Sequence, residues 1–316
     1  MLQSLRALIT WDCSPAILEP LRALDVAVEH IPHQDDEAEL CRAIADKHAL
    51  LCHPFARVTR AVIDAAPQLR VVSTVAVGYD NIDLAPLRER NIPLGHTPGV
   101  VVESTADVTY GLILGVMRRL FSGDRYVRAN AWPGGMDALG NDLAGKLLGI
   151  VGMGAIGMSV ARRARASGMR IAYTNRNPRA DAGDAAFLPL GELLANADCL
   201  CVLAPLSVET YRLVDAAALA KMKRGAYLVN AARGAIVDTG ALYDALASGH
   251  LAGAAVDVLD PEPIGADHPL LSLPTFTITP HVGTGTVETR RAMASLCVAN
   301  AAAGLRGEPL VAQVAL

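Results

Sequence analysis

The sequence has few aromatic residues, no long apolar run and no strong charge of either sign. Phe, Trp and Tyr make up 4% of the 316 residues, whereas 52% are hydrophobic, so Ala, Val and Leu must form most of the core. The net charge of -4 argues against a general nucleic-acid or anionic-membrane surface. No apolar run approaches the ~20 residues of a membrane span, and no basic-then-apolar signal segment opens the chain. We therefore expect a cytoplasmic α/β protein that binds neither nucleic acid nor membrane.

The cysteines lack the spacing of a metal site or of a disulfide framework. They are Cys13, Cys41, Cys52, Cys199, Cys201 and Cys297, and no two of them form a C-x-x-C pair. Cys199 and Cys201 alternate within an apolar strand pattern, which favours buried free thiols. The sequence thus predicts no metal ligands and a reducing compartment.

Glycine is concentrated in one turn, between an apolar run at 147–151 and a helical segment. Gly152, Gly154 and Gly157 have G-x-G-x-x-G spacing, and a second apolar run follows at 169–173. This order of strand, glycine turn, helix and strand is the context of a dinucleotide-binding fingerprint. Gly152 allows the tight turn, Gly154 lets the backbone approach a pyrophosphate, and Gly157 lets the helix pack on the strand. The helix N-terminus offers N–H groups and positive charge to phosphates. The alternative is a glycine-rich packing turn.

The end of the second apolar run has no acidic residue. A carboxylate normally stands there and bonds the ribose hydroxyls of NAD, whereas this chain has Asn175 and Arg176, with Arg179 close behind. An Asp would repel a 2′-phosphate, and an Asn beside two arginines would attract one. We therefore expect NADP(H) in preference to NAD(H), with NAD(H) still usable. The alternative is a solvated basic loop.

Apolar strands alternate with helical segments along the whole chain, which predicts parallel α/β sheets. Strands are expected at 6–10, 26–30, 50–53, 70–75, 92–95, 147–151, 169–173, 199–204, 227–230, 254–258 and 276–279. Helices are expected at 15–23, 37–47, 60–66, 103–120, 158–166, 190–195, 215–222, 239–248 and 287–305. The stretch 122–145 has no regular pattern, and we interpret it as a subunit-contact arm or as a surface loop.

Three candidate catalytic residues follow strands of the second half. Arg233 follows 227–230 in the segment LVNAARG, Glu262 ends the segment VDVLDPE, and His281 lies in TPHVG. Ligands of an open parallel sheet bind outside the carboxyl ends of its strands, so we expect all three on the cofactor's side. Each residue alone has another interpretation: Arg233 as a surface or capping charge, His281 as a structural histidine, and Glu262 as a solvated residue of a proline-rich turn.

The segments VGYDNID, HTPGV, ESTAD, NAARG and PHVG, together with the glycine fingerprint, occur in an order that resembles the D-isomer-specific 2-hydroxyacid dehydrogenase family. Within it they are most similar to the glyoxylate/hydroxypyruvate reductase branch. The resemblance implies a Rossmann doubly wound cofactor domain at 101–284. This domain would be inserted in a smaller flavodoxin-like α/β substrate domain made of 1–100 and 285–316. It also implies a homodimer.

The resemblance assigns roles to the three strand-end residues. Arg233 would hold the carboxylate and carbonyl oxygen of the substrate through its planar fork of donors. His281 would give a proton to the carbonyl oxygen as hydride arrives at the carbon, and Glu262 would orient the ring and favour its charged form. The backbone N–H groups of Val77 and Gly78 would receive the substrate carboxylate.

The resemblance also assigns cofactor contacts. Ala155 and Ile156 would offer backbone N–H groups to the pyrophosphate, and Thr105 would lie near the phosphates or the nicotinamide. Asp257 would touch the nicotinamide carboxamide, and Gly283 lies just past His281. The adenine side would be walled by Leu203, Ala204 and Pro205, with Thr210 close by. Packing or capping is the alternative for Val77, Thr105 and Thr210.

The expected reaction is the NADPH-dependent reduction of a small 2-oxo acid, glyoxylate or hydroxypyruvate, to the D-2-hydroxy acid. One alternative is an NAD-dependent D-2-hydroxyacid dehydrogenase for a bulkier acid. Another is a non-catalytic, NAD(H)-sensing binding protein of the same fold. The segment His53-Pro54-Phe55 occupies the place where family members vary the wall of the substrate pocket, and Phe55 either narrows the site or belongs to the core.

Overall fold

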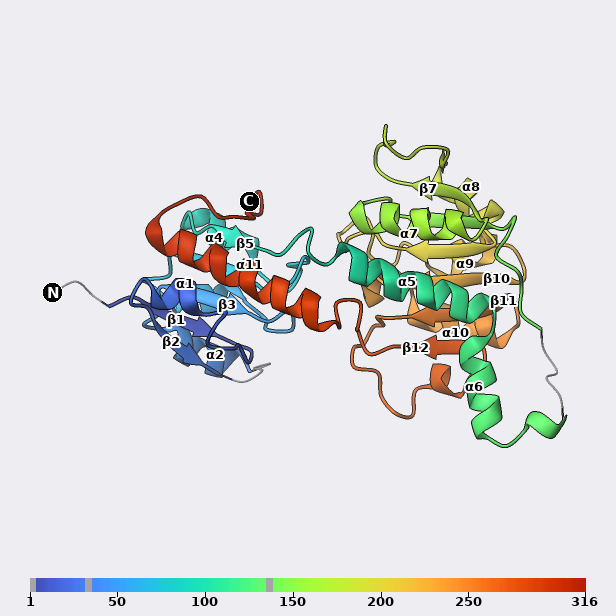
Figure 1. The fold of residues 1–316 in the computed structure, drawn as a ribbon, viewed down its shortest axis with the longest axis horizontal. Helices are drawn as coiled ribbons and strands as arrows, with labels where there is room; N and C mark the ends of the chain where they lie inside the picture. The colour runs from blue at the N-terminus through green and yellow to red at the C-terminus, as the bar shows by residue number, and fades with distance from the viewer. Residues whose placement is uncertain (1–3, 32–35, 135–138) are drawn as a thin grey trace. The chain divides into compact units, whose positions relative to one another are not determined.

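A computed structural model describes residues 4–31, 36–134 and 139–316. The chain divides into two compact units, the first made of Met1–Val101 with Thr286–Leu316 and the second of Val102–Gly285. Each unit is built on a parallel sheet flanked by helices (Figure 1). The unit bounds differ by one residue from the expected domain bounds, and the substrate and cofactor roles of the units stay predictions.

Unit 1 contains a five-stranded sheet in the order β2-β1-β3-β4-β5, and every pairing is parallel. Its strands are β1 (Arg6–Ile9), β2 (Ala27–His30), β3 (Ala49–Cys52), β4 (Val71–Thr74) and β5 (Leu94–Gly95). This is the flavodoxin-like strand order, whose switch point lies between the first and third strands. Strands β3 and β4 are buried along their whole length, as expected of a parallel sheet covered on both faces.

The helices of unit 1 are α1 (Glu19–Arg22), α2 (Glu37–Ile44), α3 (Arg60–Asp64), α4 (Leu84–Glu89) and α11 (Val287–Arg306). Helix α11 returns from the far end of the sequence and packs on β3 and β4. A Cβ on Gly304 would lie 2.6 Å from Cβ of Val71, so a glycine is needed for this close packing. The hydroxyl of Thr286 caps the helix by accepting a hydrogen bond from the Thr289 N–H.

Unit 2 contains a seven-stranded, all-parallel sheet in the order β12-β11-β10-β9-β6-β7-β8. Its strands are β6 (Leu147–Val151), β7 (Arg170–Thr174), β8 (Ala186–Phe187), β9 (Cys199–Val202), β10 (Ala226–Asn230), β11 (Leu251–Val256) and β12 (Phe276–Ile278). Counted within the unit this is the Rossmann order with one further strand, and its switch point lies between β6 and β9. The predicted doubly wound α/β fold is confirmed.

Helices and two apolar clusters cover the faces of this sheet. The helices are α5 (Val102–Met117), α6 (Leu120–Arg128), α7 (Ala155–Ala166), α8 (Leu190–Asn196), α9 (Ala216–Lys221) and α10 (Thr239–Ala247). Short 3-10 turns lie at Trp132–Gly134, Gly234–Ile236 and Pro269–Ser272. Helix α5 packs against α7, β10 and β11. Among the described residues, no helix is long and apolar enough to cross a bilayer.

Several elements differ from those expected. Helix α4 and strand β8 were not expected. Helix α6 lies almost entirely in the stretch that was expected to be irregular, and none of its residues is buried. Helix α1 covers only the last turn of the expected helix at 15–23. Helix α7 begins at Ala155 instead of 158, since Gly157 lies inside its first turn, and β11 begins three residues early at Leu251. Residues 135–138 of the expected arm or loop lie outside the described part of the chain.

Candidate active site

The glycine turn after β6 needs its first glycine for two reasons. Gly152 has φ +97, a conformation that residues with a Cβ rarely adopt. A Cβ there would also lie 2.4 Å from the backbone nitrogen of Ala204, because the segment after β9 passes directly over the turn. The Gly152 N–H donates to Thr174 O at 3.0 Å, which ties the turn to the end of β7.

The second and third glycines have different surroundings. A Cβ on Gly154 would meet nothing within 4 Å, so open space lies beside the turn. A Cβ on Gly157 would lie 2.7 Å from Gly152 O, so this glycine lets the helix close onto the turn itself. Helix α7 begins here, and its first N–H groups, those of Ala155 and Ile156, have no acceptor within the helix. Open space beside the start of a 12-residue helix fits the pyrophosphate of a dinucleotide.

The end of β7 differs in detail from the sequence interpretation. Asn175 Oδ1 accepts a hydrogen bond from the Met153 N–H at 2.7 Å, so its amide is engaged with the glycine turn. Arg179 pairs with Asp181 at 2.6 Å, which offsets its charge. Arg176 is exposed and forms no hydrogen bond or ion pair with any residue that the structure describes. The two arginines, which the sequence presented alike, are therefore not equivalent.

The loop after β9 lies within electrostatic reach of Arg176. The pKa of Glu209 is lowered, chiefly by a hydrogen bond from the Ser207 hydroxyl, with a smaller contribution from the Arg176 charge. Thr210 Oγ1 donates to Pro205 O at 2.7 Å and accepts from the Ser207 N–H at 2.7 Å. These bonds support the capping interpretation of Thr210, which closes the turn that follows Leu203, Ala204 and Pro205.

His281 and Glu262 form a hydrogen-bonded pair. His281 Nδ1 lies 2.6 Å from Glu262 Oε1, and the two side chains are 32% and 30% exposed. Because Nδ1 donates to the carboxylate, a proton exchanged with a substrate would have to come from the other ring nitrogen, Nε2. The backbone of His281 is left-handed with φ 52, and its N–H points at Asp257 O (3.0 Å) and Thr279 O (2.9 Å).

Asp257 holds the segment that carries His281. It is 2% exposed, and Oδ1 accepts from Thr279 Oγ1 at 2.6 Å and from the Val282 N–H at 2.9 Å. Oδ2 accepts from the Gly283 N–H at 2.8 Å. Thr105 of α5 lies beside this segment, since a Cβ on Gly283 would be 3.4 Å from Thr105 Cγ2. The carboxylate of Asp257 therefore fixes the histidine segment, a function that sequence reasoning did not assign to it.

Arg233 is held by the residue that ends β10. Asn230 is 1% exposed, its Nδ2 donates to Arg233 O at 2.9 Å, and its Oδ1 accepts from the Ala232 N–H at 3.1 Å. Sequence reasoning missed Asn230, although a polar residue that ends an otherwise apolar buried strand was a usable signal. A Cβ on the next residue, Gly234, would lie 2.0 Å from the carbonyl carbon of Leu259.

The fold thus gathers three strand-end residues at one edge of one sheet. Arg233, Glu262 and His281 follow β10, β11 and β12, which are neighbours in the sheet (Figure 1). Glu262 and His281 are in contact, and the close approach of Gly234 to Leu259 joins the arginine turn to the segment that leads to Glu262. A cation, a proton donor and its carboxylate partner therefore lie at the edge where a parallel sheet binds ligands.

The residues expected to contact substrate from unit 1 also follow strand ends. Val77 and Gly78 come after β4, and Val77 is 36% exposed, with its carbonyl accepting a hydrogen bond from His96 Nδ1 at 3.0 Å. Phe55, after β3, is 49% exposed, so the prediction that it could belong to the core is wrong. The turn that carries Phe55 is anchored by His53, whose N–H donates to the buried Thr10 Oγ1 at 2.8 Å.

The cysteines agree with the sequence interpretation. Cys199 and Cys201 are buried free thiols in β9, as predicted. Burial raises the pKa of the Cys52 thiol to about 12. Within the described ranges, no group of three or more His, Cys, Asp or Glu side chains could hold a metal ion.

The family follows from comparison with known proteins. A model of the NAD-binding domain of D-isomer specific 2-hydroxyacid dehydrogenases matches residues 110–283, more than half of the chain. The chain belongs to the D-isomer specific 2-hydroxyacid dehydrogenases.

Relatives within this 2-hydroxyacid dehydrogenase family agree with the predicted glyoxylate reductase branch. The chain is 41% identical over 277 residues to a glyoxylate reductase of Thermofilum pendens, covering 85% of this chain and 82% of that protein. It is 42% identical over 258 residues to a glyoxylate/hydroxypyruvate reductase B of Pectobacterium carotovorum, covering 80% and 81%.

A solved structure of a glyoxylate/hydroxypyruvate reductase is also similar to this chain. The NADPH-dependent glyoxylate/hydroxypyruvate reductase of Sinorhizobium meliloti, in complex with NADP and malonate, matches with a TM-score of 0.89 and 32% identity, covering 99% of this chain and 97% of that one. As a 2-hydroxyacid dehydrogenase, the protein is an NAD(P)-dependent oxidoreductase.

Proposed function

We propose that this dehydrogenase reduces small 2-oxo acids, glyoxylate and hydroxypyruvate, to D-2-hydroxy acids with NADPH. The observation that carries the proposal is the 2.6 Å pair of His281 and Glu262 on the same sheet edge as Arg233, in the unit that holds the glycine turn. The names of the relatives in the glyoxylate reductase branch support the substrate class.

The chain's own residues would hold the cofactor at the switch point of unit 2. Gly152, Gly154 and Gly157 leave room for the pyrophosphate, and the N–H groups of Ala155 and Ile156 would bind it. Arg176 would bind a 2′-phosphate, with Asn175 fixing the turn beside it. The proposed adenine contacts are made by Leu203, Ala204 and Pro205. The remaining cofactor contacts are assigned to Thr105, Asp257 and Gly283. Reduced nicotinamide bound here supplies the hydride.

Arg233 and His281 act on the substrate. The planar guanidinium of Arg233 binds the carboxylate and the carbonyl oxygen, and the N–H groups of Val77 and Gly78 receive the carboxylate. His281 donates the proton on Nε2 to the carbonyl oxygen as negative charge develops there. Glu262, bonded to Nδ1, orients the ring and compensates its positive charge.

A substrate panel tests this proposal. Purified protein is assayed with NADPH and with NADH against glyoxylate, hydroxypyruvate, pyruvate and larger 2-oxo acids. The highest kcat/KM is expected for glyoxylate or hydroxypyruvate with NADPH. A preference for a bulkier acid with NADH would favour the NAD-dependent alternative, and absence of turnover with every acid would favour a cofactor-sensing binding protein.

Gly154→Ala tests the proposed pyrophosphate site. A Cβ at this position has space and φ is -83, so we expect Tm to change by no more than ~2 °C. The methyl group would stand where the pyrophosphate approaches, so Kd for NADPH should rise about tenfold, or ~1.4 kcal/mol. Fluorescence titration and a thermal melt measure the two effects. Gly111→Ala in α5 also meets nothing within 4 Å and serves as the control. An unchanged Kd in Gly154→Ala would contradict the assignment.

Arg176→Ala tests the cofactor preference. We expect KM for NADPH to rise about tenfold, consistent with ~1.5 kcal/mol for a charge-assisted hydrogen bond, and KM for NADH to stay within about twofold. Arg179→Ala is the matched control, because Asp181 already offsets the Arg179 charge and the loss should be smaller. Equal effects of Arg176→Ala on the two cofactors would remove the basis for NADPH preference.

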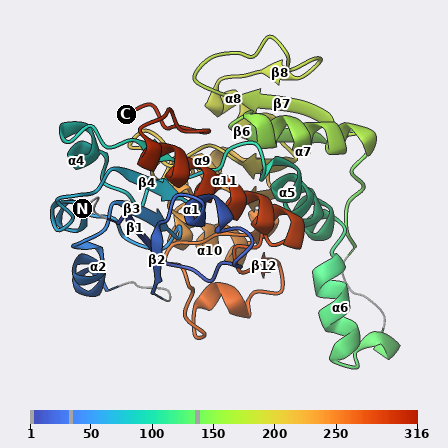
Figure 2. The same cartoon turned by 60° about the vertical axis from the view of Figure 1, so that its left-hand side comes forward.

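We also propose that α6 is the predicted subunit-contact arm of a homodimer. No α6 residue is buried, yet Leu120 and Val127 are 54% and 48% exposed and Trp132 in the following turn is 70% exposed. Figure 2 shows α6 projecting from unit 2, to which it is tied by a hydrogen bond from Arg125 Nη2 to Pro274 O at 3.1 Å. Apolar side chains on a projecting helix are suited to burial against a second copy of the chain.

The double substitution Val127→Asp, Trp132→Ala should convert the dimer to a monomer. Light scattering coupled to size exclusion should give the mass of two 33.1 kDa chains for the wild type and of one for the variant. Val311→Asp, at a 65% exposed position of unit 1, should remain dimeric. A wild-type monomer, or a double variant that stays dimeric, would contradict the role of α6.

A further inference from the structure

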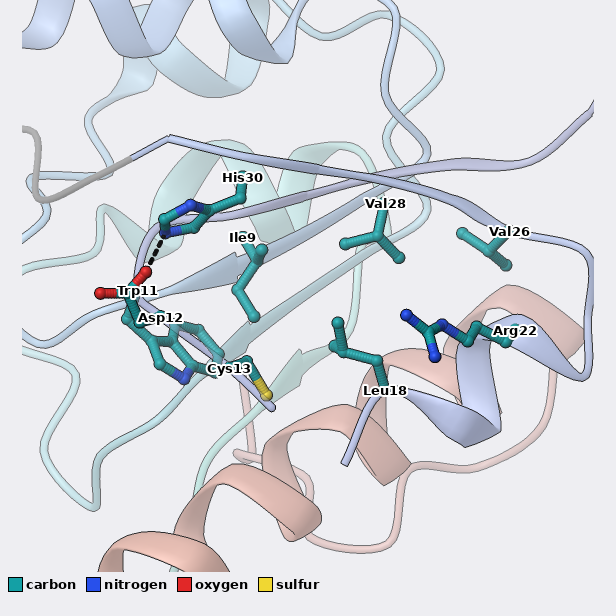
Figure 3. Close-up of a pocket in the computed structure, with 9 residues that line it drawn as sticks. All are labelled: Ile9, Trp11, Asp12, Cys13, Leu18, Arg22, Val26, Val28 and His30. Atoms are coloured by element: carbon teal, nitrogen blue, oxygen red, sulfur yellow. Dashed lines mark ion pairs between the residues drawn. The ribbon is translucent and has the colours of Figure 1, made fainter. Parts of the chain in front are cut away.

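Unit 1 contains a pocket of about 300 Å³ that the reduction reaction does not use. It lies between β2 and the segment that joins β1 to α1 (Figure 3). Ile9, Leu18 and Val28 give it apolar walls, and Trp11, Cys13 and Arg22 also line it. This volume is at the lower end of the range of small-molecule sites, about 300–1,000 Å³, so it suits a ligand with a single ring.

The pocket exists because the edge strand is only partly covered. Strand β2 is the last strand of its sheet, and Val28 in its middle is only partly buried. Helix α1, which follows the pocket-lining Leu18, is only four residues long. Apolar surface on one side of β2 is consequently open to a small molecule.

The pocket is separate from the candidate substrate loop of unit 1. Val77 and Gly78 follow β4, and the order β2-β1-β3-β4 puts two strands between β2 and β4. With strands about 4.8 Å apart, the two places are about 14 Å from each other across the sheet. A ligand in the pocket would not occupy the Val77–Gly78 site.

The charge in the pocket points to an anionic ligand. Arg22 extends its guanidinium toward Leu18 and Val28 in Figure 3, and it forms no hydrogen bond or ion pair with a residue in the described ranges. The acidic residue of the lining, Asp12, is fully exposed and pairs with His30 at 3.5 Å. The guanidinium is therefore the charged group available to a ligand, and a planar guanidinium binds carboxylates through two parallel hydrogen bonds.

We propose that this pocket binds a small aromatic carboxylic acid. The ring packs between the indole of Trp11 and the apolar walls, and the carboxylate pairs with Arg22. The ligand needs no 2-oxo group, which distinguishes it from a substrate. Cys13 lies in the same lining, so its reactivity reports on occupancy.

Alkylation of Cys13 tests the proposal with phenylacetate as the probe. The wild-type protein is treated with iodoacetamide over a range of phenylacetate concentrations, and labelling of each cysteine is followed by peptide mass spectrometry. We expect phenylacetate to slow labelling of Cys13 at least threefold at saturation without affecting Cys41, which does not line the pocket. In Arg22→Gln, half-protection should need about tenfold more phenylacetate, the usual loss for one charge-assisted pair.

Two control variants and a neutral probe make the result specific. Arg88→Gln, in α4 and outside the pocket lining, should protect like the wild type, and so should Arg233→Gln. 2-Phenylethanol, which has the ring without the carboxylate, should bind the wild type and Arg22→Gln equally. Equal protection by phenylacetate in Arg22→Gln, loss of protection in Arg233→Gln, or no protection of Cys13 at any concentration would overturn the proposal.

Discussion

His281→Ala will lower kcat with glyoxylate and NADPH by about 10²- to 10⁴-fold, the usual contribution of a positioned general acid. Removal of the imidazole takes away the proton that stabilises the developing negative charge on the carbonyl oxygen. The Kd for NADPH should stay within about twofold, because His281 follows β12 whereas the glycine turn follows β6, with three strands between them in the sheet. Steady-state rates and a fluorescence titration of NADPH give the two quantities.

Glu262→Gln provides the graded comparison. An amide in place of the carboxylate keeps a hydrogen bond to Nδ1 but cannot compensate the charge of the ring. We expect a loss in kcat smaller than that of His281→Ala, again with unchanged NADPH binding. If His281→Ala keeps kcat within about threefold of the wild type, another group supplies the proton and the assignment is wrong.

Gly234→Ala will destabilise the protein by about 3 kcal/mol or more, the upper part of the range for overpacking. A Cβ there would lie 2.0 Å from the carbonyl carbon of Leu259 and 2.5 Å from the nitrogen of Asp260, so backbone on both sides must move. The movement displaces the turn of Arg233 from the segment that leads to Glu262. We therefore expect Tm to fall by at least ~6 °C, with a large loss of kcat/KM.

Gly111→Ala is the steric control for this substitution. Its Cβ would meet nothing within 4 Å, and Ala is favoured over Gly inside a helix such as α5, so Tm should stay the same or rise. Thermal melts of Gly234→Ala, Gly111→Ala and the wild type measure the three Tm values. A Gly234→Ala protein with wild-type Tm and kcat/KM would contradict the expected clash with the backbone of Leu259 and Asp260.

The features of the fold that could be predicted from the sequence are those that require a particular kind of residue, such as glycine in a tight turn or apolar residues in a buried strand. The glycine spacing predicted the turn after β6, and the φ of +97 at Gly152 shows why glycine is required there. The β/α alternation predicted both parallel sheets, since strands buried on both faces are apolar along their length. Arg233 and His281 were expected at one edge of the second sheet because each follows a parallel strand, and the carboxyl ends of parallel strands meet at the same edge.

The remaining features depend on neighbours that are distant in the sequence. Asn175 bonds Met153, 22 residues away, and no local pattern indicates that its amide is already engaged. Asn230 and Asp257 hold the turns of Arg233 and His281 by hydrogen bonds to backbone atoms. Because every residue has these backbone atoms, the sequence does not show which of them will be bonded. Helix α6 was missed because it is only nine residues long and contains Ser122 and Gly123, which are weak helix formers.

The most direct test of the central claim is the product of hydroxypyruvate reduction. Purified protein is incubated with hydroxypyruvate and NADPH, the oxidation of NADPH is followed by absorbance, and the glycerate formed is resolved by chiral chromatography. The account predicts one D-glycerate for each NADPH oxidised, with the rate reduced at least 100-fold in His281→Ala. Formation of L-glycerate, or oxidation of no NADPH with hydroxypyruvate and glyoxylate alike, would contradict it.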